Sequence, residues 1–485
     1  MGKSAGIGPG RLGRIAGRGE RIGGATISEL QAMVDEAAAA SGVAGAQVCV
    51  ILDEQRAQFV YGSANAELYI PMTGDTVVQV GSVTKVFNAA MIMTLVEDGR
   101  LDLDAPVVEY VPDLKLADKQ AQETITLRQL LSMSAGLDNG HATPLKGDGA
   151  LARYVALLRD IPQVFAPGRG FGYSSAGSCI AGYAAERATG TPWDLLMQKR
   201  VFEPAGLVHA VTLAEELPYH RVSVGHAPAQ RGRSPKVVRP WHVSQGGGPG
   251  GATFATTAHD LARFGQLFIN GGKAANGDQV LSQTAVRMMT NPTIDAPAAY
   301  KWGARQQWGL GPYVAHWGDA IVWGHAGGNQ SGGAQLIWFP QKRAVLAFVI
   351  NTIGAFDEFT ARMFGDFSQA VLGVSAPTLA PPEPQLRIGD PRRFVGAFAR
   401  NGMRYEISQD AGRLRYKEIS LRRGGLGDAL GEVVQGELVS LGGDRFLVKT
   451  PGPSGPISIA FFGDDGQGRA ANLVVPMFAT RRVDG

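Results

Sequence analysis

The chain has little cysteine, little net charge and no long apolar run. Its 485 residues include two cysteines, carry a formal net charge of +3 and contain no run of about 18 apolar residues that could span a membrane. Cys49 and Cys179 lie in apolar stretches, which favours small buried residues over a disulfide or a catalytic thiol. No basic run is interleaved with aromatic residues, so we expect no nucleic-acid partner. We expect a cytoplasmic protein without a membrane span.

Signatures of metal and cofactor chemistry are also missing. The eight histidines are scattered, and there is no H-E-x-x-H zinc motif, G-x-S-x-G elbow or Walker loop. Residues 246–251 are rich in glycine, but Lys-Ser/Thr does not follow them. Residues 8–13 match the dinucleotide pattern G-x-G-x-x-G, but they contain a proline and follow no strand. We therefore predict no cofactor and no metal.

What is present is an ordinary globular composition, 45% apolar and 18% charged. Residues 1–24 lack an apolar stretch of signal-peptide length and are expected to form a flexible arm. Four prolines mark residues 376–385 as a linker between a catalytic domain, 25–375, and a smaller domain, 386–485. Short strand-like runs separated by turn residues predict that the smaller domain is a β-barrel.

The larger domain is predicted to be α+β. Strand patterns at 46–52, 335–339 and 344–350 lie near its two ends, whereas 104–281 is mostly helical in pattern. This arrangement predicts one sheet built from both ends of the domain beside a helical region. The long segment 216–251 is interpreted as a rim or lid of a site, with a plain surface loop as the alternative.

The most informative motif is Ser82-Val83-Thr84-Lys85, the Ser-x-x-Lys arrangement of β-lactamases and penicillin-binding proteins. Residues 86–96 are apolar and free of Gly and Pro, so they predict a buried helix. On a helix, positions i and i+3 share a face, and an amine there can take the serine proton. The alternative is an N-capping serine followed by an exposed lysine.

Four further stretches carry a family resemblance. Residues 126–137 resemble the "TIRHLLTHTSGL" segment of the serine β-lactamase-like family, and 165–168 with 173–177 resemble its "PG…YSNxG". Residues 254–264 are similar to its "STARDLARF", and 324–328 to its "GHTGG". The resemblance covers roughly residues 40–355. It implies an α+β domain, that is, an antiparallel sheet flanked by helices, with the site between this sheet and an all-helical region. The C-terminal barrel is similar to the appendage of several peptidase members.

The resemblance assigns the nucleophile to Ser82. Lys85 is the first candidate for the base that activates it, provided that burial lowers its pKa. Tyr173 is the second candidate, because its phenol can relay a proton to the leaving group. The sequence leaves the division of the base role between Lys85 and Tyr173 open.

Other site residues follow from the same motifs. His325 replaces the lysine of the Lys-Thr-Gly motif, and the N–H groups of Ser82 and Gly328 are expected to form the oxyanion hole. Gly327 would permit close approach of the substrate. Ser175 stands where the family usually has Asn, so its contacts to substrate must differ.

The family includes class C β-lactamases, D-alanyl-D-alanine carboxypeptidases, D-aminopeptidases, carboxylesterases, acyltransferases and hydrolases of linearised peptide toxins. We expect a serine hydrolase that cleaves amide or peptide bonds of small peptides through an acyl-enzyme on Ser82. The alternative is a carboxylesterase; a β-lactamase, an acyltransferase and an inactive scaffold are less favoured. The expected partner is a small-molecule or short-peptide substrate, with a homo-oligomer possible.

Overall fold

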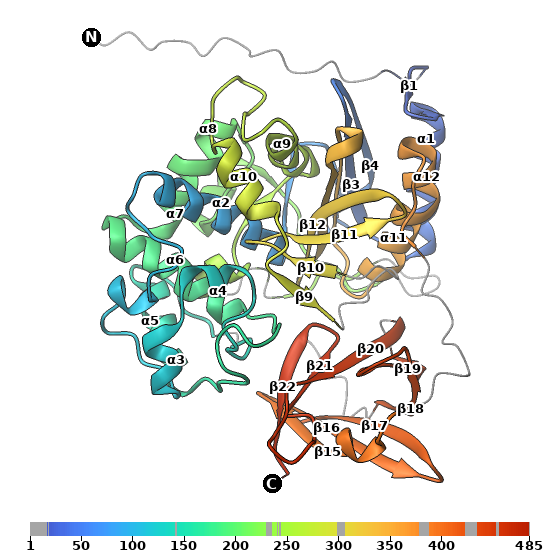
Figure 1. Cartoon of the computed structure of the whole chain (residues 1–485). Coiled ribbons are helices and arrows are strands. Elements are labelled where there is room, and N and C mark those ends of the chain that lie inside the picture. The colour runs from blue at the N-terminus through green and yellow to red at the C-terminus, as the bar shows by residue number, and fades with distance from the viewer. Residues whose placement is uncertain are drawn as a thin grey trace.

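Figure 1 shows the computed structural model, in which a sheet, a helical region and a C-terminal barrel pack together. The structure describes residues 17, 19–140, 143–228, 235–239, 241, 244–297, 306–377, 388–421, 434–452 and 455–484. The expected α+β class with an appended barrel is confirmed.

A nine-stranded sheet forms the centre of the larger domain, in the order β5-β4-β3-β14-β13-β12-β11-β10-β9. Its strands pair antiparallel, and β3 from the start of the domain lies beside β14 from its end, as the sequence predicts. The bounds are β3 Gly45–Leu52, β4 Gln55–Asn65, β5 Ile70–Pro71, β9 Ile294–Ala296, β10 Gln306–Trp308, β11 Tyr313–Trp317, β12 Ala320–Asn329, β13 Gly332–Phe339 and β14 Ala344–Ile350.

Both faces of this sheet are covered, which explains why β14 is apolar throughout. Alternate residues of a strand point to opposite faces. Leu346 and Phe348 belong to the apolar cluster formed with α1, α11 and α12, whereas Val345 and Ala347 belong to the cluster formed with α9. The covering helices are α1 Ile27–Ala40, α11 Phe356–Arg362, α12 Ser368–Leu372 and α9 Ala258–Ile269.

The helical region lies on the α9 side of the sheet (Figure 1). Its helices are α2 Thr84–Glu97, α3 Lys119–Thr124, α4 Leu127–Leu131, α5 Ala150–Ala156, α6 Ser175–Thr189, α7 Trp193–Met197, α8 Glu203–Ala205 and α10 Gln283–Thr290. Residues 84–95 of α2 are all buried, so this helix is the central element of the region. A small sheet, β7-β6-β8, leads into it (β6 Thr76–Gln79, β7 Arg221–Val222, β8 Ala255–Thr256).

The C-terminal domain is a closed eight-stranded barrel. Seven strands overlap the runs whose residues predict strands, and the eighth, β22, has no predicted counterpart. The runs are 393–398, 404–407, 413–416, 437–441, 445–449, 457–462 and 471–475. The barrel interior is filled by apolar and aromatic side chains such as Phe398, Tyr416 and Phe461. The strands are β15 Gly396–Arg400, β16 Met403–Asp410, β17 Arg413–Ser420, β18 Val434–Ser440, β19 Arg445–Gly452, β20 Gly455–Phe462, β21 Asn472–Val475 and β22 Phe478–Arg482.

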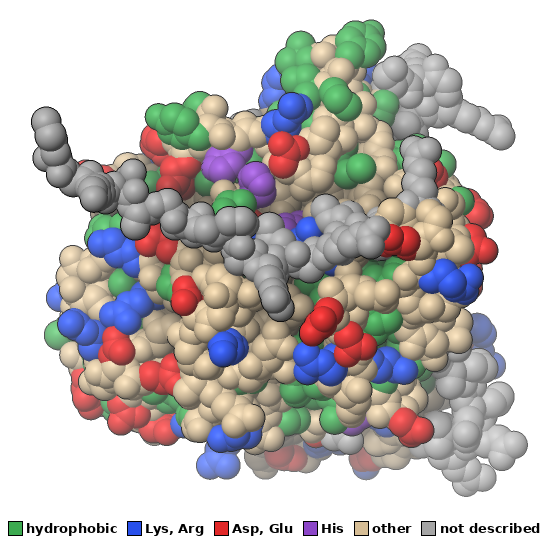
Figure 2. Space-filling model, turned by 90° about the horizontal axis from the view of Figure 1, so that it is seen from above, with side chains coloured by type: hydrophobic (Ala, Val, Ile, Leu, Met, Phe, Trp, Pro, Cys, Tyr) green, Lys and Arg blue, Asp and Glu red, His purple; other side chains and the backbone are tan. Residues whose placement is uncertain are grey.

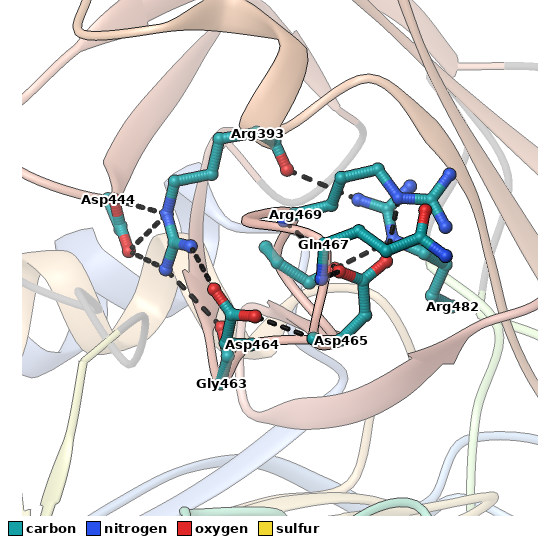
Figure 3. A network of polar contacts seen from close by, with 10 residues as sticks. Arg393, Asp444, Gly463, Asp464, Asp465, Gln467, Arg469 and Arg482 are labelled. Atoms are coloured by element: carbon teal, nitrogen blue, oxygen red, sulfur yellow. Dashed lines mark hydrogen bonds and ion pairs between the residues drawn. The ribbon is translucent and has the colours of Figure 1, made fainter.

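The barrel docks on the helical region through an apolar contact. The rings of Phe165 and Phe462 meet edge to face with centroids 5.4 Å apart, and Asn472 Nδ2 donates to the carbonyl of Val164 at 2.8 Å. Next to this contact, ion pairs hold the loop between β20 and β21: Arg393 with Asp464 at 3.7 Å, and Arg469 with Asp465 at 2.6 Å (Figure 3).

At the N-terminus, packing begins before the expected boundary at residue 25. Residues Arg21–Ile22 form β1, which pairs with β2, Ala25–Thr26, and Ile22 is fully buried. Residues 1–16 of the expected arm and 378–387, which include most of the expected linker, lie outside the described residues.

Two surface properties bear on the expected partners. In the part of the chain that the structure describes, no helix is both long and apolar enough to cross a membrane. On the face seen in Figure 2, basic and acidic side chains are interspersed, and neither sign gathers into a broad patch.

Candidate active site

Ser82 lies in a tight turn between β6 and α2. Residues Gly81–Val83 form one 3-10 turn, and Ser82 keeps partial exposure among buried neighbours. Gly81 has φ +56°, and a Cβ at this position would lie 2.7 Å from the backbone nitrogen of Gly328. Only glycine fits both this conformation and this close approach. The turn therefore places the backbone of Ser82 beside the end of β12.

Lys85 lies one turn further along, on the same face as Ser82. Its Nζ donates to Ser82 Oγ at 3.0 Å and to the carbonyl of Gly250 at 2.5 Å. Its side chain is 2% exposed, which rules out the alternative of a capping serine with an exposed lysine. Burial lowers the pKa of Lys85 to about 7, so a large share of this amine is neutral near neutral pH.

Tyr173 closes the cluster from the segment before α6. The Ser82 side chain partly offsets the effect of burial on the pKa of the Tyr173 phenol, and Lys85 Nζ lies 4.8 Å from the centroid of the Tyr173 ring. Burial raises the pKa of the Tyr173 phenol above its ordinary value. The phenol is therefore protonated near neutral pH and suited to donate a proton, whereas the neutral amine of Lys85 is suited to accept one.

His325 lies on β12 behind Tyr173, with the two ring centroids 6.1 Å apart. Its Nδ1 is 2.5 Å from the carbonyl of Ala326; since a carbonyl only accepts, Nδ1 carries the proton. Burial, together with the nearby Lys85, lowers the pKa of the imidazole to about 3. Nε2 is buried, and among the described residues it has no hydrogen-bond partner. The ring is thus a neutral acceptor and not a cation.

The two N–H groups of the expected oxyanion hole lie on adjoining backbone segments. A Cβ on Gly327 would lie 1.9 Å from the carbonyl oxygen of Val80 and 2.8 Å from Ser82 N. Strand β12 therefore touches the backbone of the Ser82 turn, and a side chain at 327 would push the two apart. Gly328, the next residue, is exposed.

Gly250 is a site residue that the sequence reasoning missed. It lies in the glycine-rich stretch 246–251 of the segment 216–251, and its carbonyl is the second acceptor of Lys85. A Cβ at 250 would lie 3.3 Å from Ser175 Cβ and 3.2 Å from Cys179 Sγ, so the loop packs closely on α6. The density of glycines was the available signal; it indicated a functional loop but not which carbonyl would contact Lys85.

The barrel also reaches this site. The backbone N–H of Tyr173 donates to the carbonyl of Met477 at 2.9 Å. The ring of Phe478 meets that of Tyr173 at 90° with centroids 5.8 Å apart, and the Arg400 guanidinium lies 4.6 Å from the centroid of the Phe478 ring. The turn between β21 and β22 therefore forms one wall beside Tyr173, which the sequence reasoning had not placed there.

No group of three or more His, Cys, Asp or Glu among the described residues is arranged to hold a metal ion. The chemistry available at this site is that of a hydroxyl, an amine, a phenol and two backbone N–H groups.

With this geometry in place, comparison with known proteins identifies the family. The family model for Beta-lactamase matches residues 30–365. The chain belongs to this family. Penicillin-binding protein 4 of Amycolatopsis lactamdurans is 30% identical over 367 residues, which cover 74% of this chain and 94% of that protein.

Two further matches show the breadth of the family and the extent of the fold. Esterase EstB of Burkholderia gladioli is 31% identical over 221 residues, 40% of this chain and 54% of the esterase. The crystal structure of SurE superposes with a TM-score of 0.77 at 25% identity, over 94% of this chain and 99% of that chain. The family comprises serine hydrolases of more than one substrate class, so family membership supports a hydrolase and leaves the substrate open.

Proposed function

We propose that this protein is a serine hydrolase that cleaves amide or peptide bonds of small peptides through an acyl-enzyme on Ser82. One observation carries the proposal. Lys85, with its pKa lowered by burial to about 7, lies 3.0 Å from Ser82 Oγ. A neutral amine at hydrogen-bond distance is the activating base that a serine nucleophile needs.

In the proposed reaction, Ser82, Lys85 and Tyr173 carry out all the proton transfers. Ser82 Oγ attacks the substrate carbonyl carbon while Lys85 takes the hydroxyl proton, and the N–H groups of Ser82 and Gly328 stabilise the oxyanion. When the intermediate collapses, Tyr173 gives its proton to the leaving nitrogen and recovers one from Lys85. Water then attacks the acyl-enzyme, and the proton transfers run in reverse.

The protonated phenol favours amides over esters. An amine must be protonated as it leaves, whereas the leaving group of an activated ester departs without that help. The buried, protonated Tyr173 supplies this proton. The ring of Phe478 from the barrel packs against Tyr173, and we infer that the barrel limits the approach there to short substrates.

A carboxylesterase is the second candidate, and His325 favours it. The family's Lys-Thr-Gly lysine offers a permanent cation, whereas the neutral imidazole of His325 offers none for a substrate carboxylate. The same feature, together with Ser175, disfavours β-lactam hydrolysis. Acyl transfer and an inactive scaffold stay the less favoured readings.

A substrate panel tests the proposal. A p-nitroanilide peptide, a p-nitrophenyl ester, a D-amino-acid amide and nitrocefin would be assayed with wild type and Ser82→Ala. We expect amide turnover that Ser82→Ala abolishes, and a fluorophosphonate mass shift on the Ser82 peptide of wild type alone. Ester turnover without amide turnover would favour the carboxylesterase. Amide turnover retained in Ser82→Ala would overturn the nucleophile assignment.

The expected homo-oligomer stays a prediction. Light scattering of the full chain across a concentration series would give its mass in solution, and a monomer at all concentrations would contradict it.

A further inference from the structure

A groove of about 740 Å³ lies where the barrel meets the helical region. One wall consists of residues 164–166 and Arg169, and the other of the loop between β20 and β21 and the end of β22. We call this feature the junction groove. Its volume falls in the range of about 300–1,000 Å³ that is typical of small-molecule sites. It is separate from the catalytic cluster, because none of Ser82, Lys85 and Tyr173 lines it.

The three carboxylates that line the junction groove, those of Asp464, Asp465 and Asp484, already have partners. Asp465 accepts from Arg469 Nε at 2.6 Å (Figure 3). Asp464 and Asp484 each accept from a backbone N–H of the barrel, and each lies within 3.7 Å of an arginine nitrogen. Their negative charge is therefore already offset by the arginines that they contact.

Two arginines line the junction groove without such a partner. Arg169 belongs to the helical region and Arg481 to β22 of the barrel. Among the residues that the structure describes, neither guanidinium makes a hydrogen bond or an ion pair. In the same part of the chain, Nη1 and Nη2 of Arg469 are unengaged, since its bond to Asp465 uses Nε. Donors for an anion are thus present on both walls.

Arg482 adds a fixed positive charge to the barrel wall. Its side chain is 6% exposed, and its guanidinium donates to the carbonyls of Ala470 and Val395, both at 2.8 Å. Burial lowers the pKa of Arg482, and the nearby charge of Arg469 acts in the same direction, against the opposite effect of Asp484. Four arginines and three carboxylates line the groove, and a bound anion would offset the surplus of positive charge.

The geometry points to the junction groove as a binding site for a small anion that carries at least two phosphate or carboxylate groups. Arg169 binds one group from the helical region, and Arg469 and Arg481 bind another from the barrel. Arginine suits both kinds of group, because its planar donors match two oxygens at once. The rings of Phe165 and Phe462 line the same groove and can contact an apolar part of the ligand. This inference goes beyond the proposed function and does not depend on it.

A ligand in the groove would bridge the two chain segments that meet at Tyr173. Arg169 precedes Tyr173 by four residues, and Arg481 follows Phe478 by three residues on β22. The N–H of Tyr173 donates to the carbonyl of Met477 at 2.9 Å. An anion held by both walls should therefore stabilise the docked barrel, because a ligand that binds only the folded state raises its stability.

Calorimetric titration of the full chain with sodium pyrophosphate and with sodium citrate, at constant ionic strength, tests the site. We expect saturable binding of at least one probe and a rise in the melting temperature with that probe. Arg169→Gln and Arg481→Gln should each weaken binding about tenfold or more, since each removes charge-assisted hydrogen bonds. Arg100→Gln is the matched control. Arg100 is an exposed arginine outside the groove, so this variant should bind like wild type.

The two probes also distinguish the source of the anion. Tighter binding of pyrophosphate indicates a phosphorylated ligand, and tighter binding of citrate indicates a polycarboxylate. The inference is wrong if wild type binds neither probe, or if the double variant of Arg169→Gln and Arg481→Gln binds as tightly as wild type. Both side chains are exposed and unbonded among the described residues, so the variants should fold, which circular dichroism checks.

Discussion

The backbone N–H of Tyr173 donates a 2.9 Å hydrogen bond to the carbonyl of Met477 in the turn between β21 and β22. A residue of the C-terminal barrel therefore fixes the main chain at the proposed proton donor. The adjacent Phe478 packs its ring edge-on to the tyrosine ring. Through these contacts the barrel holds Tyr173 in position, although the barrel contributes none of the proposed acid–base groups.

Phe478→Ala should lower kcat more than it changes KM. Removing the ring frees Tyr173 to shift, and misplacement of an acid–base group by about 1 Å can cost up to about 10²-fold in rate. Phe462→Ala is the matched control, because Phe462 lies at the same domain contact but packs on Phe165. Steady-state kinetics with an amide substrate should show the kcat loss only in Phe478→Ala. Equal losses in the two variants would indicate general loosening of the interface.

A chain that ends near Leu379 should aggregate. Truncation removes the barrel side chains that cover Val164 and Phe165 as well as the contacts at Tyr173. Newly exposed contiguous apolar surface promotes association. Size-exclusion chromatography of the truncated chain checks this expectation. A soluble truncated protein that cleaves longer peptides would instead show that the barrel mainly caps the cleft.

The sequence predicted the sheet built from both ends of the domain, the buried helix after Ser82 and most strands of the barrel. These follow from local periodicity and from motifs whose spacing is fixed by one helix turn, as for Ser82 and Lys85. Local patterning did not predict β11 and β12, and only the family resemblance placed Gly328 on a strand. The run of β12 contains three glycines, a histidine and an asparagine, which weaken a strand pattern, and β11 has five residues.

The contacts that complete the site could not be predicted from the sequence, for a different reason. Gly250 comes from a loop and Phe478 from a distant domain, and each reaches the site only through tertiary packing. Their residue types carry no chemical signature, because what matters at Gly250 is a backbone carbonyl and at Phe478 the contact of a ring with Tyr173. Local sequence cannot encode either property.

The pH profile of kcat/KM should rise with pH and level off with an apparent pKa of about 7. Lys85 must be neutral to accept the serine proton, and burial places its pKa there. Activity is therefore lost as the pH falls through 7 and the amine is protonated. The imidazole of His325, whose pKa burial lowers to about 3, should add no step above pH 5. A profile flat from pH 5 to 9 would contradict Lys85 as the base.

Lys85→Ala and Tyr173→Phe should each lower kcat at least about 10²-fold, the lower end of general acid–base contributions. In the proposed mechanism the two side chains act on the same reaction and exchange one proton, so the losses should not add in the double variant. Single-turnover kinetics of the two single variants and the double variant measures this coupling. A double variant that shows the full product of both losses would indicate independent roles.

Ser175→Asn should change substrate preference more than stability. Ser175 is the first residue of α6, is partly exposed and lies near Gly250, whose carbonyl accepts from Lys85, so the longer side chain can reach toward Lys85. An amide oxygen there would give Lys85 a further acceptor, which favours the charged amine and moves the rising limb of the pH profile to higher pH. Ser175→Ala is the control, because it removes the hydroxyl without adding an amide. Ser175→Asn could instead match wild type both in its relative rates on amide, ester and β-lactam substrates and in its pH profile. That result would show that the side chain at position 175 contacts neither the substrate nor the base.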